Sequence, residues 1–353
     1  MGATDWLTLS LIPGIGDRTF TQLITAFGSP EAVLACGRGA LSPYLSAKQM
    51  DALLAGADPA QLALSQEWLS HEGQSLLTLA DPDYPFYLSE IADAPPLLYC
   101  LGRRELLNRP CLGIVGSRNA TPQGVKDAEA FATTLSNTGI TIVSGMALGI
   151  DAAAHRGGLQ GMGSSIAVVG TGLDRIYPAR NKTLAHQLAE NGLIVSEFPL
   201  GTPPLPGHFP KRNRIISGLS RGVLVIEAAP DSGSLITARV AAEQGRDVFA
   251  IPGSIHSPLS RGCHALIKQG AKLVESAQDV LEEMAWAITT PPSSSGATEP
   301  DPILDAMDTA PMTADSIAER CGLTLDALSA KLLMLELEGR VATLPGGRYQ
   351  KLN

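Results

Sequence analysis

The stretch Cys111-Leu112-Gly113-Ile114-Val115-Gly116-Ser117-Arg118-Asn119 decides the fold, because an apolar run ends there at a glycine, a hydroxyl and an arginine. A short apolar run bounded by turn residues is typical of a buried strand in a parallel sheet. Parallel strands joined by helices bring such turns together at helix N-termini, where phosphate binds well. The pattern returns at Ile140–Val143 before Ser144-Gly145, Ile166–Val169 before Gly170-Thr171-Gly172, and Val223–Ile226 before a loop ending in Ser232-Gly233-Ser234.

The segment from Cys111 to about Trp286 alternates strands, glycine turns and helices. This alternation predicts the α/β class, with a parallel sheet covered by helices on both faces. Leu76–Leu79 and Leu97–Leu101 read as two strands that lead into this domain. The predicted helices are Gln123–Asn137, Gly149–Gln160, Arg180–Asn191, Leu235–Gln244, Arg261–Gln269 and Ala277–Met284, and the further strands are Ile194–Ser196, Val248–Ile251 and Lys272–Val274.

Two smaller parts flank the sheet domain, which we place at 73–288. Residues 1–72 predict short helices at Trp6–Leu11, Arg18–Phe27, Pro30–Leu34, Ala47–Leu54 and Pro59–Ser70, and the turn 11–16 resembles a helix-hairpin-helix or an ordinary turn in a helical bundle. A Pro-, Ser- and Thr-rich linker is predicted at 289–300. Residues 301–353 predict three helices and a hairpin, which is a winged helix. Its 8 acidic and 5 basic residues favour a protein contact over DNA binding there.

Charge is unevenly distributed along the 353 residues. The net charge is −9, but residues 102–221 hold 13 Lys+Arg and 7 Asp+Glu, so this segment is basic within an acidic chain. Such a pattern predicts a bounded anion site. No apolar run is long enough for a membrane helix, and the N-terminus lacks the basic start of a signal peptide, so we expect a cytoplasmic protein with no membrane contact.

The densest basic run is Phe209-Pro210-Lys211-Arg212-Asn213-Arg214. An aromatic beside clustered cations suits a nucleic-acid strand whose base stacks while its phosphate is neutralised; a solvated helix start with Phe209 in the core is the alternative. Arg180 and Lys182 open the helix after the third strand. Gly116-Ser117-Arg118 and Ser232-Gly233 supply backbone, hydroxyl and guanidinium donors, although Ser232 is equally suited to capping a helix.

Catalytic chemistry is weakly indicated. Asp151 and His155 share one helix face, where a structural pair is favoured over a catalytic dyad. Glu197 and Glu227 follow strands and suit the holding of Arg and Lys side chains, while His256 and His264 complete the candidates. We find no nucleophile with its base, no metal-ligand spacing, no disulfide framework among the five cysteines and no dinucleotide fingerprint. The sequence therefore predicts a protein that is not an enzyme and carries no cofactor or metal.

A set of motifs resembles the DNA-processing protein A (DprA/Smf) family over about residues 75–285. The motifs are Gly116-Ser117-Arg118, Ser144-Gly145-Met146-Ala147 with Gly149-Ile150-Asp151 and Ala154-His155, Gly170-Thr171-Gly172-Leu173-Asp174, Tyr177-Pro178, Ser196-Glu197-Phe198-Pro199, Phe209-Pro210 with Arg212-Asn213-Arg214-Ile215-Ile216, Ser232-Gly233-Ser234-Leu235-Ile236-Thr237-Ala238, and Phe249-Ala250-Ile251-Pro252-Gly253. The flanks fit the family's sterile-alpha-motif-like helical domain and winged helix. Where family members carry a lysine after Tyr-Pro, this chain has Ala179.

The resemblance implies an extended Rossmann-like fold that binds single-stranded DNA without strong sequence preference. It also implies homodimers, protection of incoming DNA and loading of RecA recombinase during natural transformation. Arg118 is the implied chief phosphate ligand, and Phe209, Arg212 and Asn213 line the strand's path. Gly145 and Ser232-Gly233 are the implied backbone donors, Arg180 or Lys182 replaces the missing lysine, and Cys263, His264 and Leu266 fall in the dimer region.

Two alternatives stay open at this point. The first is a nucleotide-processing enzyme of the lysine-decarboxylase-like Rossmann class, although the Pro-Gly-Gly-x-Gly-Thr-x-x-Glu signature of that class is missing. The second is a regulator of double-stranded DNA that acts through the winged helix. Release of free base from a nucleotide, or loss of DNA binding on removal of the C-terminal part, distinguishes these alternatives from the leading hypothesis.

Overall fold

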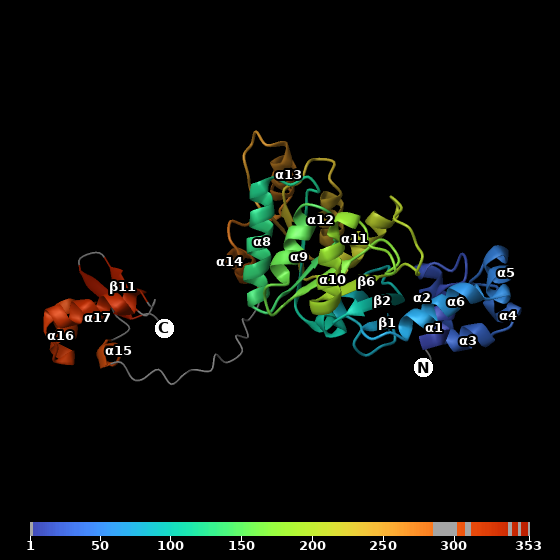
Figure 1. Ribbon diagram of the computed structural model, residues 1–353, viewed down its shortest axis with the longest axis horizontal. Coiled ribbons are helices and arrows are strands. Elements are labelled where there is room, and N and C mark those ends of the chain that lie inside the picture. The colour runs from blue at the N-terminus through green and yellow to red at the C-terminus, as the bar shows by residue number, and fades with distance from the viewer. Residues whose placement is uncertain (1–2, 285–301, 308–311, 338–340, 345–346, 352–353) are drawn as a thin grey trace. The chain divides into compact units, whose positions relative to one another are not determined.

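The computed structural model describes residues 3–284, 302–307, 312–337, 341–344 and 347–351 (Figure 1). The chain forms two compact units, Met1–Ile288 and Thr289–Asn353. The predicted linker 289–300 lies outside the described residues, so that prediction stays untested.

Six helices form the N-terminal part, one more than predicted. They bury Trp6, Leu9, Phe20 and Leu23, and the same core includes Tyr99 from the sheet. Because this core continues onto the sheet, the N-terminal helices pack against the central domain. The sterile-alpha-motif likeness remains a prediction. The helices are α1 Ala3–Ser10, α2 Asp17–Phe27, α3 Pro30–Ala35, α4 Arg38–Leu41, α5 Ala47–Ala55 and α6 Pro59–Leu69.

A nine-stranded sheet is the centre of the first unit, in the order β1-β2-β6-β5-β4-β3-β7-β8-β9. Strands β3 to β9 pair in parallel, whereas β2 runs antiparallel to both β1 and β6. The predicted Rossmann-like sheet is thus confirmed, with two added strands that extend its edge. The strands are β1 Gln74–Thr78, β2 Leu97–Gly102, β3 Cys111–Gly116, β4 Thr141–Ser144, β5 Ser165–Val168, β6 Leu193–Ser196, β7 Gly222–Ile226, β8 Asp247–Ala250 and β9 Lys272–Leu273.

Helices cover both faces of the sheet, as Figure 1 shows. One layer packs beneath Leu112, Ile114 and Leu224 and comprises α8 Pro122–Asn137, α9 Ile150–Gly158 and α14 Ala277–Glu283. The opposite layer packs on Val115, Val143 and Val225 and includes α7 Phe86–Ser89, α11 His208–Leu219, α12 Gly233–Glu243 and α13 Arg261–Lys268. Helix α10 Lys182–Asn191 lies next to β6 and follows directly after the short 3-10 turn η2 Ala179–Asn181 in the sequence.

Helix α11 was not among the predicted helices. Its first turn contains Pro210, and Gly207 precedes it, so the local sequence reads as a loop. Proline is nevertheless accepted in the first turn of a helix, where its missing N–H has no intrahelical acceptor. Burial of Ile215, Ile216 and Leu219 against the sheet then holds the helix in place.

The second unit has the winged-helix pattern that the sequence predicts. Helices α15 Pro302–Ala306, α16 Ala314–Cys321 and α17 Leu325–Leu337 pack around Ile317, Leu328 and Leu332. A sheet in the order β10-β12-β11 joins them, formed by Met312–Thr313, Arg348–Lys351 and Val341–Leu344. Thr313 caps α16 by accepting the Ser316 N–H.

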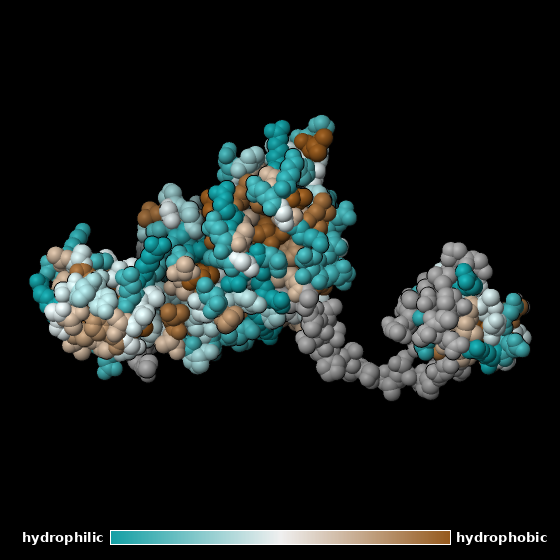
Figure 2. Space-filling model, turned by 180° about the vertical axis from the view of Figure 1, so that it is seen from behind, coloured by the Kyte–Doolittle hydropathy of each residue, from teal (hydrophilic) through white to brown (hydrophobic). Residues whose placement is uncertain are grey.

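The described helices fall short of what a membrane span requires. In the part of the chain that the structure describes, none of the helices is both long and apolar enough to cross a bilayer. On the face of the molecule in Figure 2, apolar patches are interrupted by polar residues.

Candidate nucleic-acid interface

A groove opens beyond the carboxyl ends of β3 and β7. The chain runs outward from β3 to β6 and then returns to place β7 on the other side of β3, so these two strands form the switch point of the topology. Ligands bind at such points in open parallel sheets. The groove has a volume of about 680 Å³. Its lining includes Gly116 at the end of β3 and Ser117, Arg118 and Asn119 after it, Asp151 of α9, Tyr177, the α11 residues Phe209, Arg212 and Asn213, and Asp231, Ser232 and Gly233 around the start of α12.

Arg212 is the buried cation of the groove, with 4% of its surface exposed. Its Nη1 donates to the Val168 carbonyl over 3.0 Å, while its Nε has no acceptor. Burial lowers the pKa of this guanidinium to about 10, so it remains charged at neutral pH. A Cβ on Gly145 would overlap the guanidinium, so glycine is required there to seat the arginine.

The loop Gly145-Met146-Ala147 is held from below by helix α9. One carboxylate oxygen of Asp151 accepts the N–H groups of Gly145 and Ala147, at 3.2 and 3.3 Å. His155 Nε2 accepts the Met146 N–H, and its Nδ1 contacts the Ser165 hydroxyl at 2.7 Å. Burial lowers the pKa of His155 to about 3, so the imidazole is neutral. The expected pairing of these two side chains is therefore wrong, since each has other partners; both instead position the loop, which is a structural role.

Arg118 lines the same groove as Arg212 and is exposed. Its guanidinium lies 5.5 Å from the centroid of the Phe209 ring, and that ring lies 5.8 Å from Tyr177. Among the described residues, neither arginine has a carboxylate within ion-pair distance. The structure thus brings into one groove, beside two aromatic rings, two guanidinium groups that form no direct ion pair among the described residues; the Asp151 carboxyl lines the same groove.

The glycine and serine residues act differently from one another. A Cβ on Gly116 would strike the Ile226 carbonyl and Ile150, so its glycine serves close packing. The Gly145 N–H is already bound to Asp151, which corrects its predicted role as a free donor. Ser117 lines the groove and its Oγ accepts the Asn119 N–H. Ser232 caps α12, and Gly233 opens that helix, where the first N–H groups lack intrahelical acceptors.

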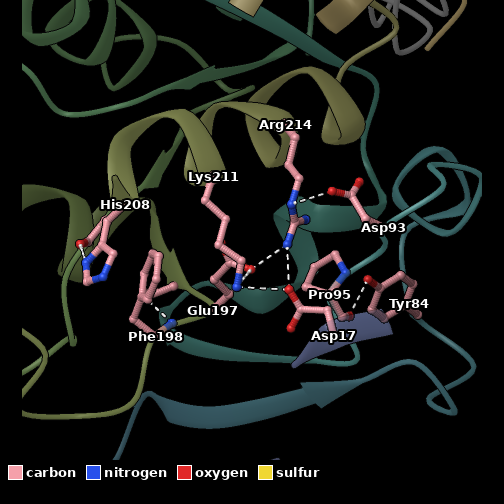
Figure 3. Close-up of polar contacts among 11 residues, drawn as sticks. Asp17, Tyr84, Asp93, Pro95, Glu197, Phe198, His208, Lys211 and Arg214 are labelled. Atoms are coloured by element: carbon pink, nitrogen blue, oxygen red, sulfur yellow. Dashed lines mark hydrogen bonds and ion pairs between the residues drawn. The ribbon is translucent and has the colours of Figure 1, made fainter. Parts of the chain in front are cut away.

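Several predicted ligands do not reach the groove. Lys211 and Arg214 lie on the opposite face of α11, because helical geometry separates them from Arg212 by about 100° or more. Both are ion-paired there with carboxylates (Figure 3). Arg180 and Lys182 are exposed beside α10 but do not line the groove.

The two glutamates that follow strands have separate partners. Glu197 pairs with Arg214 and Lys211, which confirms the prediction that it holds basic residues. Glu227 instead accepts the backbone N–H and the hydroxyl of Thr121 at the start of α8. Asn119 and Asp231 line the groove without having been singled out in the sequence. Their positions after strands were the available signal.

The residues assigned to a dimer contact lie on α13. Cys263 is buried, and its thiol donates to the Val225 carbonyl. His264 accepts the Gly253 N–H at 3.3 Å, and Leu266 lines a cleft of about 300 Å³ between α12 and α13. Cys263 therefore has a core position, whereas Leu266 borders the surface. No cluster of three or more His, Cys, Asp or Glu that suits a metal occurs among the residues described.

Family models match nearly the whole sheet domain and the C-terminal unit. The model described as DNA recombination-mediator protein A matches residues 75–285. The chain belongs to the DNA recombination-mediator protein A (DprA) family. The DprA winged helix domain matches residues 287–347, which confirms the predicted C-terminal fold.

Named relatives agree with the DprA assignment. Protein Smf of Escherichia coli (strain K12) is 45% identical over 292 residues, covering 79% of this chain and 78% of Smf. The X-ray structure of DNA processing protein A from Streptococcus pneumoniae has a TM-score of 0.68 at 42% identity and covers 80% of this chain and 99% of its own. A Helicobacter pylori structure, described for the single-stranded DNA binding mode of that DprA, has a TM-score of 0.56 at 32% identity, over 61% and 97%.

Proposed function

We propose that this protein binds single-stranded DNA in the groove and acts as a recombination mediator. The observation that carries the proposal is the pair of guanidinium groups, Arg118 and Arg212, that line one groove and form no ion pair among the described residues, although the buried Asp151 carboxyl interacts electrostatically with both. A buried cation is stable only when it is paired or hydrogen-bonded. A phosphodiester supplies the acceptors that Arg212 lacks, and Arg118 binds the same strand at the groove mouth.

The aromatic residues favour an unpaired strand over a duplex. Phe209 and Tyr177 lie beside the guanidinium groups, and Tyr177 is 46% exposed. Bases of a single strand stack on such rings, whereas in a duplex they already stack on one another. No base-reading set of side chains is needed for this mode, so we expect weak sequence preference.

The mediator role extends this binding to recombination. The description of the family model and the relatives' names as DNA processing proteins support it. We propose that the protein protects incoming single strands and loads RecA onto them during natural transformation, as a cytoplasmic homodimer that contacts its copy near Leu266.

Binding is tested by fluorescence anisotropy with labelled oligo-dT and with a matched duplex, using the full chain. We expect tighter binding of the single strand and a loss of affinity as salt rises. Equal affinity for the duplex would contradict the proposal. Incubation with nucleoside monophosphates tests the enzymatic alternative, which release of free base would support.

Loading is tested separately. RecA's ATPase is measured on single strands that are coated with single-strand-binding protein, with and without this protein. We expect faster onset of the ATPase when it is present. An unchanged onset, with intact oligo-dT binding, would restrict the function to strand binding.

A further inference from the structure

Helix α11 has two faces with opposite electrostatic character. Phe209, Arg212 and Asn213 line the groove. Lys211 and Arg214 project from the other side of the same helix, as 3.6 residues per turn requires. Any shift of α11 therefore moves the groove residues together, and whatever holds its back face sets their position.

Three carboxylates from three separate segments hold that back face (Figure 3). The Lys211 Nζ lies 2.9 Å from Asp17 and 3.3 Å from Glu197. The Arg214 Nη2 lies 3.1 Å from Asp17 and 2.5 Å from Glu197, and its Nε lies 3.2 Å from Asp93. Asp17 and Glu197 each contact both cations, so these contacts form one network and not isolated pairs.

The centre of the network is shielded from water, whereas Lys211 and Asp93 lie at its exposed rim. The side chains of Glu197 and Arg214 are 2% and 7% exposed, and that of Asp17 is 23% exposed. Exposed ion pairs contribute little, but loss of one partner from a buried group leaves the other charge uncompensated. The geometry of α11 is therefore sensitive to each carboxylate.

Asp17 reaches this network from outside the sheet domain. It is the first residue of α2, in the N-terminal helical part, whereas Glu197 directly follows β6 of the sheet. A second polar link is nearby, since Gln61 of α6 donates to the Leu200 carbonyl in the segment that leads to α11. The N-terminal helices thus contact the groove helix through a charged side chain as well as through packing.

We propose that Asp17 is a positioning residue for the groove, through which the N-terminal helical part holds α11 in its binding-competent place. The inference rests on the proposed function, because it assigns a regulator of the same site. Without the Asp17 carboxylate, α11 spends a larger fraction of time displaced, and only the remaining fraction binds. The apparent dissociation constant then rises by the inverse of that fraction.

The test compares D17N with D51N in the full chain. Both substitutions remove one negative charge from the N-terminal helices, and Asp51 pairs only with the exposed Arg38. Hydrogen exchange of the α11 amides, measured without DNA, tests directly whether Asp17 holds α11 in place. We expect faster exchange at residues 208–219 in D17N and wild-type exchange in D51N. Wild-type exchange at α11 in D17N would overturn the proposal.

Binding to oligo-dT then tests whether displacement of α11 weakens the groove's affinity for single-stranded DNA. We expect D17N to lower the affinity by about two- to tenfold, with an unchanged salt slope, because the phosphate contacts of the competent fraction are the same. A role in overall stability alone, measured well below the melting temperature, leaves the affinity at its wild-type value and does not confine faster exchange to α11. Wild-type affinity in D17N, despite faster α11 exchange, would overturn the link to the groove.

A second variant covers the case in which D17N does not fold. Lys211 is 43% exposed, so K211M removes the other end of the contact at little cost to the core. We expect K211M alone to accelerate α11 exchange. Where D17N does fold, the double variant D17N/K211M should add less than the sum of the two single effects. Strict additivity would contradict a shared contact. Failure of the wild-type protein to bind oligo-dT would refute the proposed function. The exchange result would then still decide whether Asp17 holds α11 in place.

Discussion

Replacing Arg118 by alanine tests the groove most directly. Its guanidinium is exposed, has no ion-pair partner among the described residues, and lies over the Phe209 ring at 5.5 Å. Little structure depends on it, so R118A is expected to fold normally. A hydrogen bond to a charged group contributes about 1.5–3 kcal/mol, so we expect oligo-dT affinity to fall by about 10- to 100-fold.

The salt dependence gives a second, independent measure. On a single strand, removal of one phosphate-binding cation lowers the slope of log K against log salt by about 0.7. The assay is fluorescence anisotropy at several salt concentrations. R118K retains the charge and loses the planar fork, so we expect it to keep most of the slope while recovering only part of the affinity.

The control is R38A, which removes an exposed arginine that pairs with Asp51 in the N-terminal helices. It alters the net charge as R118A does, and it leaves the groove intact. Equal affinity and slope for R118A and R38A would refute the reasoning, because the loss would then reflect overall charge and not a site.

Three further variants address the parts of the groove. G145A is expected to weaken oligo-dT binding and to lower stability by about 1–3 kcal/mol, because its Cβ overlaps Arg212; urea unfolding and anisotropy check this against G37A, whose Cβ meets no atom. F209L is expected to lose about 1–3 kcal/mol of stacking that F209Y keeps, as titration with oligo-dT shows. His155 has a folded pKa of about 3, below its ordinary 6.5, so the stability that its neutral form supports above pH 6.5 is lost as the pH falls toward 3. The free energy of unfolding of H155Q, measured with urea, should therefore fall less steeply below pH 6.5 than that of the wild type, by up to about 1.4 kcal/mol per pH unit.

The sheet and the floor of the groove could be predicted from the sequence, because they depend on patterns among residues that are close together in the chain. Each strand that ends in a glycine turn, such as β3 before Gly116, was predicted because apolar runs and turn residues alternate locally. Helix α11 escaped prediction because Pro210 and Gly207 resemble a loop, and the burial of Ile216 against the sheet, which helps to hold the helix, is a tertiary contact. Because no helix was predicted there, nothing indicated that the side chain of Arg212 would point to a different side from those of Lys211 and Arg214.

The role of Gly145 shows a second limit. A glycine after a strand suggests a free backbone donor, and the sequence contains no sign that Asp151 already accepts its N–H. That acceptor lies six residues away on the next helix, and its direction depends on how α9 packs. The need for glycine arises instead from Arg212, which is far away in sequence. Packing between distant segments decided both points.

The cationic character of the groove depends on which basic side chains are already ion-paired elsewhere. Residues 102–221 carry 13 Lys+Arg, and the run 209–214 alone holds three. Two of those three, Lys211 and Arg214, are neutralised by Asp17, Glu197 and Asp93. Counting the sequence therefore overstates the charge that a strand meets.

Only Arg118 and Arg212 line the groove as unpaired cations in the described part of the chain. Two phosphate contacts on a single strand correspond to a salt slope of about −1.4 per protomer. If every cation of the run 209–214 joined Arg118, four contacts would give about −2.8. Measurement of the wild-type slope with an oligo-dT that occupies one protomer separates these values. A slope near the larger value would mean that α11 turns its back face to the strand, and the ion-paired arrangement of Lys211 and Arg214 would not describe the bound state.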